Sequence, residues 1–264
     1  QFLPPLPIGT PPTASVSLTS SISKPDFLDA VAQAKRYIEA GDIFQIQVSR
    51  KLRCDFSGDP LTLYRYLRYT NPSPFMYYAR FGDTCLLGSS PELLVGVVDN
   101  TVSIRPIAGT RKRRSKTRSE AAMVAELEGD AKERAEHIML VDLARHDLRR
   151  CCVNGTITVN RLMSIERYQH VVHMVSDVSG TLAPDQTSVT ALQYGFPAGT
   201  VTGAPKIRAM ALINELESEA RGSYSGAVVF FDFCNQLKST LIIRSMFIQN
   251  GGVTTQAAAG VVAD

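Results

Sequence analysis

The chain lacks the cysteine patterns of a disulfide or zinc framework. Its five cysteines are odd in number and show neither a Cys-x-x-Cys pair nor a Cys/His metal spacing. No apolar run approaches the ~20 residues that span a bilayer, and the first residues have neither the basic start nor the apolar stretch of a signal peptide. We therefore expect no membrane span, reduced thiols, and a cytoplasmic protein, an organelle matrix being the other compartment that fits.

The chain also lacks a strong net charge, since 264 residues carry only +3. The charge is concentrated in residues 111–118, RKRRSKTR, where six of eight residues are basic. No aromatic residue lies among these charges to stack on bases, and no nucleic-acid module surrounds them. A solvated loop is therefore favoured over a nucleic-acid patch, and we expect no nucleic-acid partner.

The remaining composition is that of a globular protein, 44% hydrophobic and 20% charged. Residues 1–24 are rich in Pro, Ser and Thr and are expected to be a linker or the end of a preceding region, ahead of a domain at 25–264. Helical periodicity predicts helices at 25–40, 60–69, 130–147, 188–193 and 205–216. Alternating or apolar runs predict strands at 43–52, 75–81, 84–89, 93–98, 102–107, 155–159, 171–180, 226–233, 239–249 and 253–256. Irregularly interspersed helices among hairpin-linked strands indicate an α+β fold with antiparallel sheets.

Two carboxylates begin the most informative helix, DAKERAEHIMLVDLARHD (130–147). Glu133 and Glu136 are three residues apart, so they share one helix face, just before a buried apolar run. Two oxygen ligands one turn apart suit Mg²⁺, which keeps waters for a substrate. The alternative is an ordinary helix start, in which Asp130 and Glu133 form a capping box.

Three Gly-containing segments have the composition of ligand-binding turns: IAGTR (107–111), FPAGTVTGAPK (196–206) and QAAAGVVAD (256–264). Glycine lets backbone N–H groups approach a ligand closely, and a neighbouring threonine adds a hydroxyl. Together with the carboxylate pair, these segments predict a small anionic ligand held by backbone donors and magnesium.

A wider set of segments resembles one family. In order along the chain, they are GDIFQIQVSRK, NPSPFMYY, LLGSSPELLV, RPIAGTR, KERAEHIMLVDLARHD, MSIERYQHVVHMVS, FPAGTVTGAPKIRAM, RGSYSGAVVFFDF and QAAAGVVAD. They resemble the chorismate-utilising enzymes, most closely the anthranilate synthase large subunits, from about residue 25 to residue 264. The resemblance implies two packed antiparallel sheets flanked by helices, a site in a cleft, chorismate as substrate and Mg²⁺ as cofactor.

The resemblance also implies roles for individual residues. Glu133 and Glu136 would be one half of the metal site, and Arg244 with Tyr224 would hold a substrate carboxylate. Gly109, Thr110, Thr200 and Gly260 would line the carboxylate pockets. Glu92 would protonate the departing 4-hydroxyl, and His173 would be the active-site histidine, whereas His170 is expected to be structural. Pro74, Phe75 and Met76 resemble a stretch where tryptophan inhibits, although an aromatic strand start is typical of a core.

Two positions separate the branches of the family. Gln45 lies where isochorismate and salicylate synthases carry a lysine that activates water, and Ala108 lies where many aminodeoxychorismate synthases carry a lysine nucleophile. Without either lysine, direct attack of ammonia at C2 and pyruvate elimination would give anthranilate. Aminodeoxychorismate formation remains the alternative. No Gly-x-Cys-x-Gly nucleophile elbow is present, so a separate glutamine amidotransferase subunit is expected to supply the ammonia.

The sequence departs from the family pattern at several places. It ends at Asp264, before the family's second metal-binding Glu-x-x-Glu stretch and the lysine after it, and it lacks the family's N-terminal portion with the rest of the tryptophan site. We therefore expect a chain truncated at both ends. Ala258 replaces a glycine, and its Cβ is expected to crowd the carboxylate, while His146 replaces an asparagine. These departures keep a catalytically silent paralogue, which only binds an amidotransferase, among the hypotheses.

Overall fold

A computed structural model describes residues 17–113, 119–168 and 170–263. The helices are α1 (Lys24–Glu39), α2 (Pro60–Thr70), α3 (Glu120–Gly129), α4 (Ala131–Arg149), α5 (Ser188–Gly195) and α6 (Lys206–Leu216), with a 3₁₀ turn η1 (Gly199–Val201). The strands are β1 (Thr19–Ser20), β2 (Gln45–Asp55), β3 (Phe75–Phe81), β4 (Thr84–Ser90), β5 (Leu93–Val98), β6 (Thr101–Ile104), β7 (Ile107–Lys112), β8 (Thr158–Arg167), β9 (Val171–Thr181), β10 (Gly203–Ala204), β11 (Ala227–Phe231), β12 (Leu237–Leu241), β13 (Ser245–Gln249) and β14 (Gly252–Val261).

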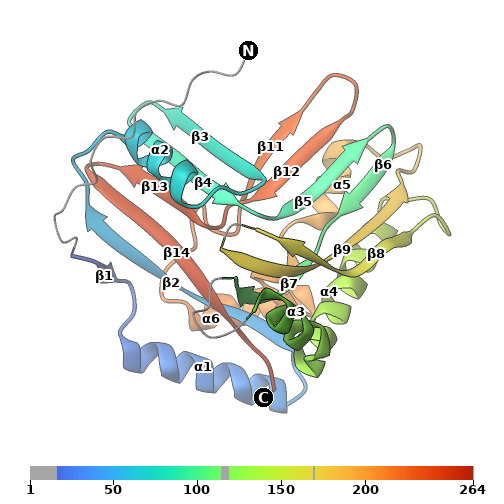
Figure 1. Cartoon of the computed structure of the whole chain (residues 1–264), viewed down its shortest axis with the longest axis horizontal. Coiled ribbons are helices and arrows are strands. Elements are labelled where there is room, and N and C mark those ends of the chain that lie inside the picture. The colour runs from blue at the N-terminus through green and yellow to red at the C-terminus, as the bar shows by residue number, and fades with distance from the viewer. Residues whose placement is uncertain (1–16, 114–118, 169, 264) are drawn as a thin grey trace.

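The strands form two antiparallel sheets (Figure 1). The first sheet has the order β1-β2-β14-β13-β4-β3, with β10 also paired to β2. The second has the order β11-β12-β5-β6-β9-β7, with β8 paired to β9. Helices flank both sheets, so the predicted α+β architecture is confirmed.

The chain passes from one sheet to the other at two short crossovers. Strand β4 of the first sheet leads into β5 of the second, and β12 of the second leads into β13 of the first. The crossovers are hydrogen-bonded to each other, because the carbonyl of Glu92 accepts from the N–H of Leu241 at 3.2 Å and the N–H of Ser89 donates to the carbonyl of Arg244 at 3.2 Å. The two sheets are therefore joined where Glu92 and Arg244 lie.

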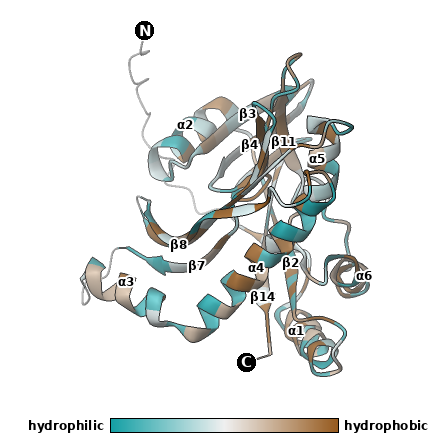
Figure 2. Cartoon of the chain, turned by 90° about the vertical axis from the view of Figure 1, so that its right-hand side faces the viewer, coloured by the Kyte–Doolittle hydropathy of each residue, from teal (hydrophilic) through white to brown (hydrophobic). Residues whose placement is uncertain are grey.

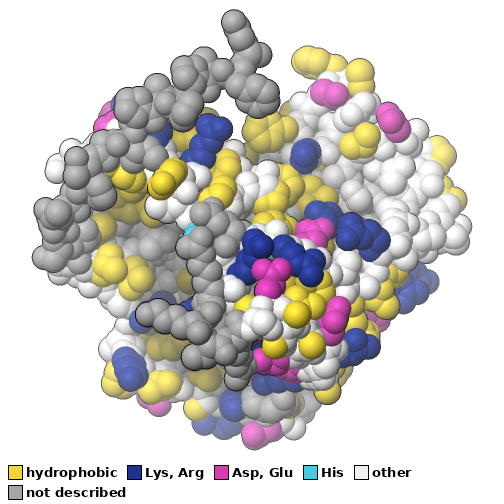
Figure 3. Space-filling view, in the orientation of Figure 1, with side chains coloured by type: hydrophobic (Ala, Val, Ile, Leu, Met, Phe, Trp, Pro, Cys, Tyr) yellow, Lys and Arg dark blue, Asp and Glu magenta, His cyan; other side chains and the backbone are white. Residues whose placement is uncertain are grey.

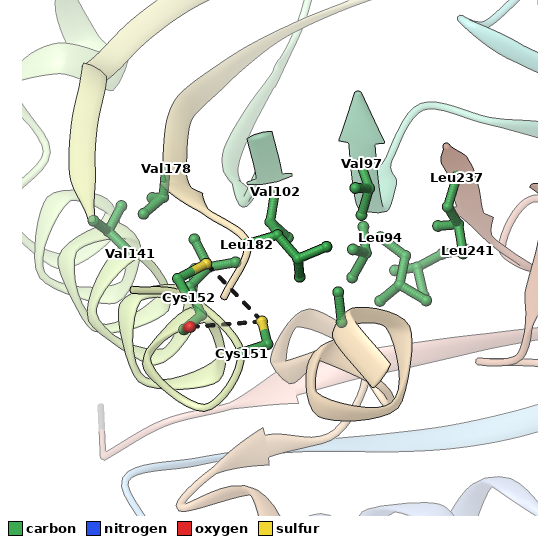
Figure 4. Close-up of a cluster of buried hydrophobic side chains, with 14 of the residues drawn as sticks. Leu94, Val97, Val102, Val141, Cys151, Cys152, Val178, Leu182, Leu237 and Leu241 are labelled. Carbon is green, nitrogen blue, oxygen red and sulfur yellow. Dashed lines mark hydrogen bonds between the residues drawn. The ribbon is translucent and has the colours of Figure 1, made fainter. Parts of the chain in front are cut away.

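Each sheet has a hydrophobic cluster against its own helices. The cluster of the second sheet includes Leu94, Val102, Val178 and Leu241 packed on α4 and α5 residues, and Figure 4 shows Cys151 and Cys152 within it. The cluster of the first sheet packs Ile46 and Val48 against α1 and α6. Apolar surface is thus buried between sheets and helices, and the face between the sheets can carry polar residues.

Helix α4 illustrates how the sequence specifies an element. Asp130 caps its first turn by accepting from the N–H groups of Lys132 and Glu133, each at 3.1 Å. Its buried residues, His137, Leu140, Val141, Ala144 and Leu148, form one stripe at helical spacing. Hydrophobic and hydrophilic stretches alternate along the helix in Figure 2. At its other end, Asp147 pairs with Lys206 at 2.8 Å and joins α4 to α6.

Several predicted elements were wrong in their extent. The strand expected at 239–249 is two strands, because the chain changes sheets at Arg244, whose φ is +51°. Segments 107–111 and 256–261 are strand residues rather than turns, since β7 pairs with β9 and β14 pairs with β2. Helix α3 was not predicted.

The N-terminal boundary and two shorter strands also differ from expectation. Residues 19–20, assigned to the linker, pair with β2. The strand expected at 43–52 begins at Gln45, and Phe44 lies before it with its side chain 68% exposed. The strand expected at 155–159 is β8, which starts at Thr158 and continues to Arg167.

Among the described residues, no helix combines the length and the apolar character needed to cross a bilayer.

Gly88 tests the packing between β3, β4 and β13. A Cβ on Gly88 would overlap the phenol of Tyr77 and the hydroxyl of Ser245, which hydrogen-bond to each other at 2.5 Å. We expect Gly88→Ala to lower the free energy of unfolding by roughly 1–3 kcal/mol in chemical denaturation. The control is Gly129→Ala, where nothing lies within 4 Å and a helical alanine should be neutral or stabilising by under ~1 kcal/mol. Equal stabilities for the two variants would contradict this packing.

Candidate active site

Glu92 is held at the first crossover. Its side chain is buried, 7% exposed, and its Oε1 accepts from the Thr200 hydroxyl at 2.6 Å. Burial raises the pKa of Glu92 to about 7, while the Thr200 hydrogen bond and the charge of Arg244 oppose the rise. A carboxyl with this pKa is largely protonated below neutral pH and can donate a proton.

Arg244, at the second crossover, contacts His173 on β9. Its Nη2 lies 3.3 Å from His173 Nε2, and His173 Nδ1 lies 2.8 Å from the Thr110 hydroxyl. Arginine can only donate, so Nε2 is the acceptor and Nδ1 carries the hydrogen that Thr110 accepts. Burial and then the charge of Arg244 lower the pKa of His173 to about 4. At neutral pH His173 is therefore an uncharged group that orients its neighbours.

The carboxylates of α4 meet both sheets. Glu133 accepts from Arg111 Nη1 on β7 at 2.7 Å, and Glu136 accepts from Gln45 Nε2 on β2 at 2.7 Å. Burial, followed by the charge of Glu133, raises the pKa of Glu136. Gln45 is fully buried, and its Oε1 makes no hydrogen bond to any described residue.

Two glycines keep the backbone close to these side chains. Gly109 has φ +83° and lies at an irregularity of β7, where a Cβ would meet Glu133 Oε2 at 3.2 Å. Gly260 on β14 would place a Cβ 3.0 Å from Gln47 Nε2 and 3.6 Å from Gln45 Nε2. These close approaches explain why both strands carry glycine here.

Tyr224 lies between α6 and β11, beside Ala258 of the first sheet. Burial raises its pKa, and a hydrogen bond with the backbone of Ala258 opposes the rise. Arg221 stacks over its ring, 5.5 Å from the centroid. Ala258 pairs with Ser49 as an ordinary position of β14, so this ladder accommodates its Cβ. The predicted crowding of a substrate carboxylate stays a prediction.

The other predicted residues lie elsewhere. Pro74, Phe75 and Met76 are at the start of β3, where Lys238 of β12 lies 5.3 Å from the Phe75 ring. His170 bonds the carbonyl of Thr70 at 2.7 Å, consistent with a structural role. His146 faces its own helix, 3.2 Å from the carbonyl of Asp142.

The basic segment differs from a simple solvated loop in its described part. Arg111 is paired with Glu133, Asp130 and Glu126, and Arg113 is paired with Glu120. Residues 114–118 of this segment lie outside the described ranges. On the face drawn in Figure 3, basic side chains likewise lie next to acidic ones. The positive charges of Arg111 and Arg113 are thus paired with neighbouring carboxylates.

Several residues that support the site were not predicted from the sequence. Tyr168 packs edge-on against His173, 5.4 Å between ring centres, and donates to Glu166 at 2.8 Å. His137, completely buried, bonds Ser176 at 2.6 Å and the carbonyl of Ala108 at 3.3 Å. The available signal was that both lie within segments that resemble the family, His137 directly after Glu136 and Tyr168 in the segment that contains His173.

A family comparison fits this geometry. The model of the family described as chorismate binding enzyme matches residues 4–264. The chain belongs to the chorismate-binding enzymes.

Named relatives agree with this assignment. The chain is 48% identical over 249 residues to anthranilate synthase component 1 of Acetivibrio thermocellus, covering 94% of the chain and 50% of the relative. It is 49% identical over 259 residues to the same component of Synechocystis, covering 94% and 51%. A solved structure of anthranilate synthase component I from Streptococcus pneumoniae superposes with a TM-score of 0.88 at 39% identity, covering 95% of this chain and 56% of that one. This chorismate-binding chain therefore spans about half the length of the curated relatives it matches.

The pKa of Glu92 has a measurable effect on stability. Its carboxyl ionises near 4.5 when unfolded and about 7 when folded, so the folded state holds the extra proton between these values. Stability from this group is complete below pH 4.5, declines as pH rises to about 7, and stays lost above that. We expect Glu92→Gln to be more stable than the parent above pH 7 by up to roughly 3 kcal/mol, relative to their difference at pH 4.

Denaturation at a series of pH values measures this difference. Comparing variant with parent cancels the opposite contribution of His173, whose lowered pKa makes stability rise with pH up to its unfolded value. If the free energies of unfolding of parent and variant change in parallel with pH, the pKa of Glu92 is not raised in the folded state.

Proposed function

We propose that this chain is the chorismate-converting part of an anthranilate synthase component 1. In the proposed reaction, ammonia attacks C2 of chorismate, the 4-hydroxyl leaves, and pyruvate is eliminated to give anthranilate. The proposal is supported by the named relatives and by the side chains at the two positions that distinguish the family branches.

The environment of Gln45 carries the proposal. Its amide nitrogen donates to Glu136, which fixes the orientation of the amide because a carboxylate accepts only from the NH₂ group. The amide oxygen is buried without a donor among the described residues. An acceptor in this state suits a neutral N–H donor such as ammonia, whereas glutamine cannot remove a proton from water.

Ala108 lies where a lysine nucleophile would be needed for aminodeoxychorismate formation. It is 8% exposed, within β7, and its carbonyl accepts from His137. An alanine cannot attack chorismate, so the covalent lysine route of many aminodeoxychorismate synthases is not open at this position.

Glu133 and Glu136 fit a partial magnesium site. Among the described residues, the second oxygen of each carboxylate has no hydrogen-bond donor, and no group of three or more His, Cys, Asp or Glu is arranged to hold a metal. Mg²⁺ is commonly held by one or two carboxylates together with waters and substrate oxygens. When bound, it would supply positive charge beside a substrate carboxylate.

The remaining residues bind chorismate and move a proton. Arg244 holds a substrate carboxylate through its planar guanidinium, and Thr110 is oriented by His173 for the same task. Gly109, Thr200, Tyr224 and Gly260 line the carboxylate pockets. Glu92, protonated near neutral pH, donates to the departing 4-hydroxyl.

A glutamine amidotransferase subunit would supply the ammonia in a cytoplasmic or organelle-matrix setting. Pro74, Phe75 and Met76 would contribute to a tryptophan inhibitor site.

Product identification tests the proposed reaction. With chorismate, Mg²⁺ and ammonium salts, we expect anthranilate and pyruvate, whereas 4-amino-4-deoxychorismate as main product would overturn the branch assignment.

We expect Gln45→Lys to divert turnover toward isochorismate, because a buried lysine with a lowered pKa can activate water. Gln45→Met is the control and should lose amination without gaining hydration. If the lysine variant keeps full amination and chromatography detects no isochorismate, Gln45 does not face the reacting carbon of chorismate.

A second substitution tests the metal assignment. Glu136→Gln should lower magnesium-dependent turnover by at least ~10²-fold, because one charged ligand is lost, while unfolding stays cooperative. The control is Asp142→Asn on the same helix, whose carboxylate is 57% exposed and pairs with Arg145. Turnover and its magnesium dependence should be unchanged in the control. Preserved turnover in Glu136→Gln would instead support a helix-start role.

A further inference from the structure

Arg221 uses every N–H group of its guanidinium within the protein. Its Nε donates to Glu217 Oε2 at 2.9 Å and its Nη2 to Glu217 Oε1 at 2.7 Å. Its remaining bonds go to the carbonyl of Val201 at 2.6 Å, the hydroxyl of Ser225 at 3.1 Å and the carbonyl of Gln47 at 2.7 Å. The side chain is 13% exposed. Arg221 therefore holds three separate segments in one plane.

Its partner Glu217 extends the connection across the first sheet. The carboxylate, 7% exposed, also accepts from the N–H and the hydroxyl of Ser49 at 2.8 and 2.7 Å. Gln256 of β14 then donates to the Ser49 hydroxyl at 2.6 Å. The pair is thus bonded to β2 directly and to β14 through one side chain.

The bonded segments are the ones that carry predicted substrate-binding residues. Val201 follows Thr200 and Ser225 follows Tyr224, while Gln47 is the register partner of Gly260. The guanidinium also stacks on the Tyr224 ring. Among the described residues, no other arginine hydrogen-bonds all three segments.

Stability alone explains this arrangement poorly. Desolvation of two buried charges offsets much of their attraction, so a buried ion pair contributes little net stability compared with apolar residues of the same shape. A planar fork bonded in five directions instead fixes the relative positions of its partners.

We propose that Glu217 and Arg221 are positioning residues for chorismate recognition, which hold the Thr200, Tyr224 and Gly260 segments at their binding distances. This inference rests on the proposed function. Neither residue needs to touch chorismate. Arg221 acts through its bonds to the three segments and through the Tyr224 ring, and Glu217 acts through Arg221 and Ser49.

The test substitutes Arg221→Lys in the full protein and measures KM and kcat for chorismate with ammonium salts. Lysine keeps the charge but has three N–H donors in place of five and loses the planar fork, so at least two of the five hydrogen bonds of Arg221 are lost. We expect KM to rise roughly tenfold with kcat changed less than about twofold, since binding in ground and transition states is weakened alike. The matched control is Arg208→Lys, another arginine that pairs with an acid, Asp42, at 3.0 Å and stacks on a tyrosine, Tyr37, at 5.8 Å. Its KM should be unchanged.

A double-mutant cycle separates positioning from general destabilisation. Tyr224→Phe should raise KM less in the Arg221→Lys background than in the parent, because the tyrosine is already misplaced. Additive effects, or an unchanged KM in Arg221→Lys while the parent converts chorismate, would overturn the positioning role alone. A parent that neither binds nor converts chorismate would overturn the proposed function, and this inference with it. Loss of cooperative unfolding in both Arg221→Lys and Glu217→Gln would assign the pair a structural role instead.

Discussion

The site depends on the hydrogen bonds that join the two crossovers between the sheets. The Glu92 carbonyl accepts from the Leu241 N–H and from the Thr240 hydroxyl, and Ser89 donates to the Arg244 carbonyl. Each crossover carries one predicted site residue, so the same bonds that fix the sheets relative to each other also place an acid near a cation. Movement of either sheet would separate Glu92 from Arg244.

Burial then sets the charge state of the groups between the sheets. It raises the pKa of Glu92 to about 7 and lowers that of His173 to about 4, so both shifts favour the uncharged form. Arg244 keeps its charge. The result is a neutral proton donor and a neutral hydrogen-bonding ring around a fixed cation, an arrangement that suits an anionic substrate whose leaving group needs a proton.

Helix α4 was predictable from the local sequence pattern, whereas two glycine-containing strands were not. The Asp130 cap, the i, i+3 carboxylates and the apolar stripe all act within a few residues, so the helix and its carboxylate face were correctly predicted. Strands 107–111 and 256–261 were mistaken for turns because glycine and alanine weaken the strand signal. Their extended form comes from pairing with β9 and β2, residues remote in sequence.

The amino-acid sequence alone was enough for the family, the α+β class and helix α4 with its two carboxylates, because motifs and hydrophobic periodicity are local properties. Only the tertiary structure decided that the 239–249 run breaks at Arg244 and that Gln45 bonds Glu136. It also decided that Arg221 links the segments of Thr200 and Tyr224 to β2. These features depend on which distant segments lie within hydrogen-bond distance, and on how much water they exclude, and spacing along the chain records neither.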